Sequence, residues 1–189
     1  MLSAMDEPSL AASIRRISRR EYDAMVDAGI FGQSDKIELL DGVLVNVSPQ
    51  GWLHADVMSW LMARFVRALD ETFVVRPLAP FAADDWSEPE PDIAVVRRDS
   101  FAREHPSKAL LLVEIADSSV RYDRKVKYSI YARAAVPEYW IVNVDDMTVE
   151  VYTQPSLTGF ASKQTLRDGD VLRPTLLPGV EIPIADFPR

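Results

Sequence analysis

The fold of this chain is decided between residues 92 and 144, where three short apolar runs follow one another: DIAVV (92–96), ALLLVEIA (109–116) and EYWIVNV (138–144). Runs of this kind are typical of strands that are covered on both faces. The stretch 123–135, between the second and third runs, has a helical pattern. It predicts a crossover connection that leaves these two strands parallel or near neighbours.

Hairpin signals on both sides of this stretch predict antiparallel pairs. Asp41-Gly42 joins two β-like runs, and Asp145-Asp146 forms a turn into TVEVYT at 148–153. An Asp-Gly pair between apolar runs is a strong hairpin signal because both turn positions need positive φ. Together with the helix crossover, these hairpins predict a mixed β-sheet.

Two further helices are predicted before the central stretch. Ser18 and Glu21 match a capping box, which opens a short helix that Gly29 ends. Apolar residues then recur at helical spacing from about His54 to Leu69. The predicted fold class is therefore α/β, with a mixed central β-sheet flanked by α-helices.

Length and composition are those of one globular domain. The 189 residues are 48% hydrophobic and 26% charged, and none is cysteine, which excludes disulfides and cysteine-ligated zinc. Residues 1–14 have little periodicity and are expected to form a flexible N-terminal tail, so that 15–189 form a single domain. There is no secretory signal pattern and no apolar run of the roughly 18 residues that span a bilayer. We therefore expect a cytoplasmic protein with no membrane partner.

The net charge of −8 is unfavourable for binding a polyanion such as DNA, because phosphate neutralisation supplies much of the affinity. A basic surface for DNA would have to be local. Basic residues gather in two places: Arg15, Arg16, Arg19 and Arg20, and Arg121, Arg124, Lys125 and Lys127. Both clusters can be solvated surface runs, but the second flanks the acidic residues considered next.

Glu114 is a carboxylate inside an apolar strand. Leu112 and Ala116 share its face, and the opposite face is apolar as well. An unpaired buried charge is costly, so such a group is paired, protonated or bound to a metal ion. The structural alternatives are a salt bridge to a nearby Arg or Lys, or a place at the exposed end of the strand.

Asp92 follows Pro91 and begins the first apolar run. An Asp after Pro is usually a turn residue, but on a strand next to Glu114 it becomes a candidate metal ligand. Hard oxygen donors of this kind suit Mg²⁺ or Mn²⁺. Such an ion polarises a phosphate oxygen and lowers the pKa of a bound water, which is the chemistry of a metal-dependent phosphodiesterase.

Lys127 lies on the predicted helix and shares a face with Ile130 and Ala134, so its side chain is expected to lean toward the sheet. A lysine there can reach a metal-bound phosphate or water as a point charge. The alternative is a pair with Asp123 on the helix surface, worth only about 0.3–0.5 kcal/mol.

Two other polar residues carry weaker signals by themselves. Glu38, in KIELLDG, reads as an outward-facing strand residue. His54 can cap the long helix, lie in solvent or contact phosphate. Because the chain has only two histidines, a histidine-rich metal site is excluded.

With these residues in hand, the chain resembles the Uma-type restriction endonuclease family of bacteria, within the PD-(D/E)XK nuclease superfamily. The matching segments follow in the family's order from about residue 18 to 155, and YDRKVK to EYWIVN is the most specific part. They are IELLDGVLV, the His54 helix start, EPDIAVV, LLVEIADSS, YDRKVKYSIYARAAVPEYWIVNV and VEVY.

The resemblance implies a restriction-endonuclease-like fold and a magnesium-dependent DNA-cleaving site. Asp92 matches the motif's first aspartate and Glu114 its second acidic residue, while Glu38 matches an acidic position that completes the metal site in similar nucleases. The superfamily's lysine belongs at the position of Ala116, but the Uma-type pattern places it on the next helix, where it matches Lys127. A second departure is Asp117-Ser118-Ser119, where relatives commonly have Ser-Pro-Ser.

Three functions remain open at this stage. The first is an endonuclease that uses Mg²⁺ or Mn²⁺ bound by Asp92, Glu114 and Glu38, with Lys127 as a further catalytic residue; cleavage of both DNA strands would require two sites and hence a homodimer. For this function the expected substrate contacts are His54, Arg121, Arg124 and Lys125. The second is a catalytically silent nuclease-fold protein that binds nucleic acid or a protein partner, and the third is an interaction domain in which the carboxylates form a structural salt-bridge network.

Overall fold

The computed structural model describes residues 14–32, 35–47, 49–101, 104–116 and 121–189, so the expected tail lies outside the described residues except for Ile14. Its helices are α1 (Arg19–Asp27), α2 (Trp52–Ala68) and α3 (Arg121–Arg133). Its strands are β1 (Ile37–Leu40), β2 (Val43–Asn46), β3 (Phe73–Pro77), β4 (Ile93–Arg97), β5 (Leu111–Ala116), β6 (Glu138–Asn143), β7 (Thr148–Ser156), β8 (Gly159–Leu166), β9 (Val171–Leu172) and β10 (Ile182–Pro183).

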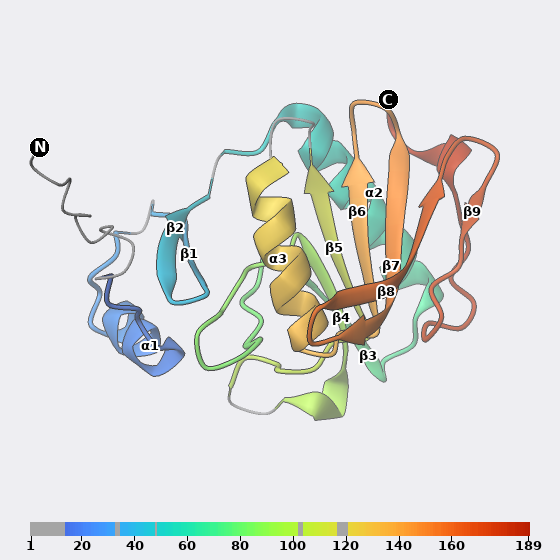
Figure 1. The fold of residues 1–189 in the computed structure, drawn as a ribbon. Helices are drawn as coiled ribbons and strands as arrows, with labels where there is room; N and C mark the ends of the chain where they lie inside the picture. Colours follow the sequence, from blue (N-terminus) through green and yellow to red (C-terminus); the bar gives the residue numbers. More distant parts are fainter. Residues whose placement is uncertain (1–13, 33–34, 48, 102–103, 117–120) are drawn as a thin grey trace, which may run out of the picture.

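The centre of the molecule is a six-stranded sheet in the order β3-β4-β5-β6-β7-β8 (Figure 1). Strands β5 and β6 are parallel, and every other neighbouring pair in this sheet is antiparallel. The mixed sheet is therefore confirmed, and so is the parallel pair on either side of the α3 crossover.

Helices α2 and α3 cover opposite faces of this sheet (Figure 1). The alternation of side chains along β5 assigns its residues to the two faces: Leu111 and Val113 pack in one buried cluster with Phe65 of α2, and Leu112 packs in another with Ile130 of α3. Full burial of an apolar side chain such as Phe65 contributes about 1.5–3 kcal/mol. By the same alternation, Glu114 lies on the α3 face.

Helices α1 and α2 each begin directly after an N-cap residue. Ser18 is the N-cap of α1, and the reciprocal bonds of the predicted capping box are both present. Helix α2 begins at Trp52 after the N-cap Gly51, two residues before the predicted start. His54 therefore lies within the first turn and does not cap the helix.

The β1–β2 hairpin turns at Asp41 and Gly42, whose φ angles of 48° and 79° are those of the predicted turn. The hairpin does not add an antiparallel pair to the central sheet as expected, because it forms a two-stranded sheet of its own. It is held instead by the segment 86–90, where Glu88 N donates to Leu39 O at 2.7 Å. Arg133 of α3 forms an ion pair with Asp41 and so fixes the hairpin beside that helix.

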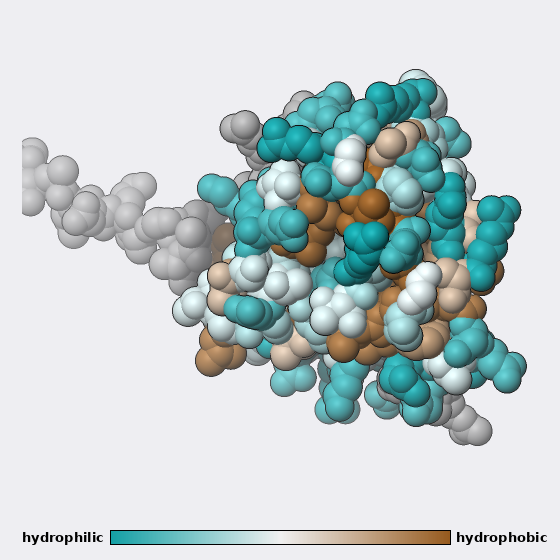
Figure 2. All heavy atoms as spheres, turned by 90° about the vertical axis from the view of Figure 1, so that its right-hand side faces the viewer, coloured by the Kyte–Doolittle hydropathy of each residue, from teal (hydrophilic) through white to brown (hydrophobic). Residues whose placement is uncertain are grey.

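The C-terminal segment completes the cover of the α2 face. Strands β9 and β10 form a small antiparallel sheet, and Ile182 and Phe187 join the α2 cluster. The ring of Phe187 lies 4.9 Å from that of Trp60, centroid to centroid. On this side of the molecule, polar side chains surround a few apolar ones that stay visible at the surface (Figure 2).

Candidate active site

Three of the predicted site residues come together from elements that are far apart in the sequence. Lys127 Nζ on α3 donates to Glu38 Oε1 on β1 at 2.9 Å and lies 3.1 Å from Glu114 Oε1 on β5. The exposed fractions of these side chains are 9% for Lys127, 3% for Glu38 and 13% for Glu114. An enclosed amine thus lies between two enclosed carboxylates.

Glu114 has a second partner on the same helix. Tyr131, one turn after Lys127 on α3, donates its hydroxyl hydrogen to Glu114 Oε1 at 2.7 Å. Tyr131 was not among the predicted site residues. The i, i+4 spacing on the face that carries Ile130 is the signal that could have found it.

Asp92 lies directly before β4. Extending the β4–β5 register by one residue from the Ile93–Val113 pair places Asp92 opposite Glu114. The carboxylate of Asp92 is buried and accepts a bond from Ile115 N at 2.7 Å through Oδ2. The two acids therefore lie on neighbouring strands, at the end of β5 where α3 follows.

The other carboxylate oxygen of Asp92 is contacted by a residue of α2 and by a residue of the segment before α2. His54 Nε2 lies 3.0 Å from Asp92 Oδ1, and Gln50 Nε2 donates to the same atom at 3.3 Å. The start of α2 at Trp52 puts His54 in the first turn, from which its ring reaches Asp92. Gln50 carried no signal in the sequence, because only the folded chain brings the residues before α2 next to β4.

The charges in this cluster are unbalanced. Burial raises the pKa of Glu114 to about 8; Lys127 lowers it, and the negative charges of Asp92 and Glu38 raise it further. Burial opposes the charged form of Lys127, but Glu114 and Glu38 outweigh it and raise the pKa of this amine. The lysine therefore stays charged beside an acid, Glu114, whose protonated form is favoured.

The donor set is of the kind that a hard divalent cation needs. Asp92 and Glu114 present carboxylate oxygens from adjacent strands, and their mutual repulsion would be relieved by a positive ion. In the part of the chain that the structure describes, no group of three or more His, Cys, Asp or Glu side chains is arranged to hold a metal. Mg²⁺ usually binds through one or two carboxylates and keeps several waters, so the chemistry of these two residues fits it.

The predicted substrate-binding residues fall into two groups. His54 is part of the cluster through Asp92, whereas Lys125 is exposed on α3. Arg121 and Arg124 lie in the first turn of α3, but their side chains, like that of Asp123, are outside the described residues. Their contact with a substrate stays a prediction.

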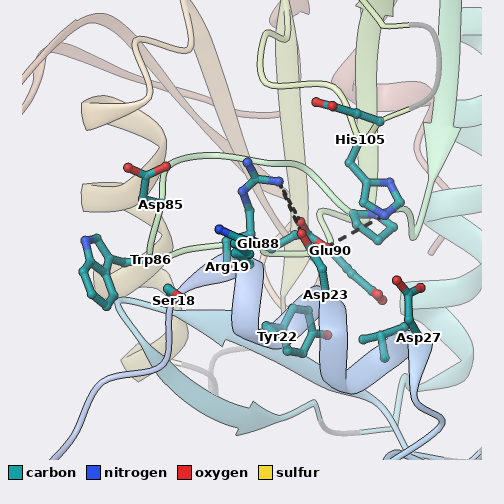
Figure 3. Close-up of a pocket in the computed structure, with 14 residues that line it drawn as sticks. Ser18, Arg19, Tyr22, Asp23, Asp27, Asp85, Trp86, Glu88, Glu90 and His105 are labelled. Carbon is teal, nitrogen blue, oxygen red and sulfur yellow. Dashed lines mark ion pairs between the residues drawn. The ribbon is translucent and has the colours of Figure 1, made fainter.

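A second set of charged residues lines a cavity of about 940 Å³ beside α1 (Figure 3). Among its charged residues, the sequence singled out only Arg19 and Arg20, as part of a basic cluster. The most buried member of the set is Glu88, which is 3% exposed. Burial raises the pKa of Glu88 from 4.5 to about 7; Asp23 and Glu90 raise it further, and Arg19 lowers it. In the sequence, Glu88 reads as an ordinary acidic residue of a loop. Its burial follows from the pairing of its own segment with β1, and this burial alone distinguishes it.

Glu88 is expected to make stability fall with pH. Because its pKa is about 7 in the folded chain and 4.5 when unperturbed, the folded state holds the extra proton between these values, and stability is lost as pH rises through them. Relative to Glu88→Gln, the wild type should lose up to about 3 kcal/mol between about pH 4.5 and pH 7. Urea unfolding across this range measures the difference, with the exposed Glu181→Gln as control. Parallel curves for wild type and Glu88→Gln would contradict it.

Fold and site together define the class of protein. A mixed six-stranded sheet with helices on both faces, carrying acidic residues and a lysine, is the α/β architecture of a restriction-endonuclease-like protein. The chain belongs to the Uma2 family, described as "Putative restriction endonuclease", whose model matches residues 19–185. The search of curated proteins found no match.

A solved structure supports this assignment at the level of the fold. The crystal structure of a "putative nuclease belonging to DUF820" from Anabaena variabilis superposes with a TM-score of 0.72. The match covers 90% of this chain and 97% of that one, at 16% sequence identity. Among the described residues, no helix is long and apolar enough to cross a lipid bilayer.

Proposed function

We propose that this protein is an endonuclease that hydrolyses DNA phosphodiester bonds with the help of Mg²⁺ or Mn²⁺. The observation that supports it best is the place of Lys127. Its charged amine is held by two enclosed carboxylates, on the strand face where Asp92 approaches Glu114. Membership of a family described as putative restriction endonucleases also favours a nuclease site over a chance cluster of charged residues.

Each residue has a role that follows from its contacts. Asp92 and Glu114 would hold the cation, with Glu38 as a third acidic residue beside them. When bound, the cation would polarise the phosphate and lower the pKa of the attacking water. Lys127 supplies a fixed positive charge for the negative charge that develops on the phosphate. Glu38 keeps that amine in place through the 2.9 Å bond.

A surrounding set of bonds positions the acids. Tyr131 orients Glu114, and His54 and Gln50 orient Asp92. The substrate would reach the cluster beside the start of α3, the part of this acidic chain where the sequence gathers Arg121, Arg124 and Lys125. Cleavage of both strands of a duplex would need two copies of the site, so the active form is proposed to be a cytoplasmic homodimer.

A second candidate function is binding of nucleic acid or a protein partner without cleavage. The net charge of −8 favours it, and so does the engagement of Lys127 by both Glu38 and Glu114. In this case the amine is satisfied within the protein, and the cluster serves as a structural network.

Cleavage assays with supercoiled and single-stranded DNA separate these functions. We expect nicking with Mg²⁺ or Mn²⁺ that EDTA abolishes and that Asp92→Asn lowers by about a hundredfold or more. Asparagine keeps the bond from Ile115 N but removes the charge. The exposed Asp168→Asn, which also removes one charge, should cleave as the wild type does.

The negative outcomes are equally clear. Cleavage that persists in Asp92→Asn or in EDTA would remove this site from the reaction. An inactive wild type that still binds DNA would support the second candidate function.

A further inference from the structure

A second cavity, of about 740 Å³, adjoins the proposed active site where α2 begins. Its lining includes Leu53, which precedes His54 in the first turn of α2, and Val144, which directly follows β6. His54 contacts Asp92 at 3.0 Å, and Val144 N donates to Ala116 O, at the end of β5, at 3.1 Å. The cavity is therefore bounded by residues that adjoin the catalytic cluster.

The cavity lies at the edge of the sheet that carries the two acids. Its lining includes the turn 144–147, which joins β6 to β7. Figure 1 shows the start of α2, the end of β5 and this turn at one edge of the sheet. Neighbouring strands are about 4.8 Å apart, so the turn lies about 5–10 Å from the end of β5. A nucleotide beside the scissile phosphate would be within reach of the cavity.

The lining combines an apolar part with a charged part. Leu53, Val144 and Met147 form the apolar part and belong to, or pack against, the buried cluster on the α2 face. The charged part consists of exposed residues that a ligand can reach: Asp145, Asp146, Arg167, Asp168 and Arg189. Three carboxylates outnumber two guanidinium groups, which disfavours a phosphate as the occupant. A flat uncharged group with polar edges fits this lining better.

One acceptor and one donor in the lining are available for such a group. Asp168 and Arg189 bind each other at 3.0 Å. The guanidinium group of Arg167, by contrast, has no partner in the described part of the chain. Asp146 is held in place by Thr148, whose backbone N–H and hydroxyl both donate to Oδ1, at 3.2 and 2.7 Å. A carboxylate keeps further acceptor capacity beyond these two bonds.

Guanine matches this acceptor and this donor better than the other DNA bases do. Its N1–H and N2–H donors lie side by side on the Watson–Crick edge, where one carboxylate can accept from both. Its O6 and N7 acceptors suit the paired donors of an arginine. Base pairing occupies N1 and N2, so only an unpaired guanine presents both sets of atoms.

We propose that this cavity binds an unpaired guanine base of the substrate strand. Asp146 accepts from N1 and N2, Arg167 donates to O6 and N7, and the ring lies against the apolar part of the lining. The inference rests on the proposed nuclease function and adds a substrate preference to it. The enzyme should prefer single-stranded or locally unpaired DNA with a guanine next to the cleaved bond.

NMR titration of the ¹⁵N-labelled full chain with nucleosides tests the base site without DNA cleavage. The titrations are made in EDTA, so that their outcome does not depend on a metal-loaded active site. Deoxyguanosine should shift the backbone signals around Met147 and Arg167. It should bind about tenfold tighter than deoxyinosine, which lacks the N2 amino group, or deoxyadenosine. Equal responses to all three nucleosides, or none to any, would overturn the proposal.

Two variants locate the contacts, and two others control for the change in charge. Asp146→Asn keeps an oxygen for Thr148 but no longer accepts from both guanine donors, and Arg167→Gln removes the paired donors. Each should weaken deoxyguanosine binding by about tenfold. The exposed Asp99→Asn and Arg173→Gln remove the same charges elsewhere and should not. Unchanged binding in both Asp146→Asn and Arg167→Gln would overturn the proposal.

Cleavage of single-stranded oligonucleotides separates this proposal from the nuclease function on which it rests. A thymine tract with one guanine should be cut beside the guanine and about tenfold faster than a tract without it, and Arg167→Gln should cut both tracts equally. Metal-dependent cleavage that ignores guanine would overturn the base site and leave the nuclease standing. Selective guanine binding by a protein that cuts no DNA would support the base site and contradict the nuclease.

Discussion

Replacing Lys127 by methionine is expected to lower the free energy of unfolding by about 3–5 kcal/mol, the usual effect of removing one partner from a buried ion pair. The side chain of this lysine is 9% exposed and lies between Glu38 and Glu114. Without it, two enclosed carboxylates lose the cation that both of them contact. Methionine fills most of the volume of the lysine side chain, so the loss of unfolding free energy comes from the missing charge and not from a cavity.

The loss should grow with pH. Burial and the charges of Asp92 and Glu38 already raise the pKa of Glu114 to about 8, with Lys127 opposing them. Without the lysine this pKa rises further, and a carboxyl whose pKa is raised by folding loses stability as pH increases through that range. Because the pKa of Glu114 in the wild type is already about 8, the two proteins differ in the ionisation of this group only above that value. Urea unfolding at about pH 7 and about pH 9.5 should therefore give the larger loss at the higher pH.

Lys163→Met is the matched control. Lys163 also lies 2.8 Å from a glutamate, Glu150, but its side chain is 48% exposed. Its replacement should cost no more than about 1 kcal/mol, as for other surface pairs. Equal losses for the two variants, or a more stable Lys127→Met, would show that the cluster is not the buried charge network inferred from these distances. Adding Glu38→Gln to Lys127→Met should recover part of the loss.

The second large effect is expected for Glu114→Gln, and it is a loss of metal-dependent DNA cleavage. At neutral pH the amide resembles the protonated acid that the raised pKa of Glu114 favours. It also keeps an oxygen for the bond from Tyr131. Stability without metal should therefore change by less than about 1 kcal/mol. Metal-dependent DNA cleavage should fall by at least about a hundredfold, because a cation ligand is lost.

Thermal unfolding with and without Mg²⁺ or Mn²⁺ completes this test. The wild type should be stabilised by about 2.7 kcal/mol at a metal concentration of about a hundred times Kd. Glu114→Gln should lose this response, and the exposed Glu181→Gln should retain it. A wild type that ignores both metals, together with a strongly destabilised Glu114→Gln, would instead make the carboxylates a structural salt-bridge network.

Much of the site could be predicted from patterns within single elements. Strand alternation placed Glu114 on one face with Leu112, and in the structure that is the face that α3 covers. Helix periodicity turned Lys127 toward that face, together with Ile130. These inferences needed only the two-residue period of a strand and the 3.6-residue period of a helix. The resemblance of the motifs to a known family then supplied Asp92 and Glu38, which carried little signal alone.

Other features depended on contacts between distant segments. Glu38 reads as an outward strand residue, yet the fold buries it against Lys127, 89 positions away. His54 was expected to cap a helix, lie in solvent or contact phosphate, and it bonds to Asp92. The hairpin at Asp41 was expected in the central sheet and pairs with another segment. The sequence carried no signal for Glu88, which is distinguished only by the burial that this pairing produces.

The sequence by itself determined the main strands, the helices, the capping box of α1 and which face of β5 carries the acid, because backbone sterics and side-chain periodicity act over a few neighbouring residues. Only the tertiary structure decided which charges share a buried space. The partners of Lys127, Asp92 and Glu88 come from other elements. The raised pKa values of Lys127 and Glu88 follow from that packing, because desolvation and Coulomb interactions depend on distance in space and not on distance along the chain.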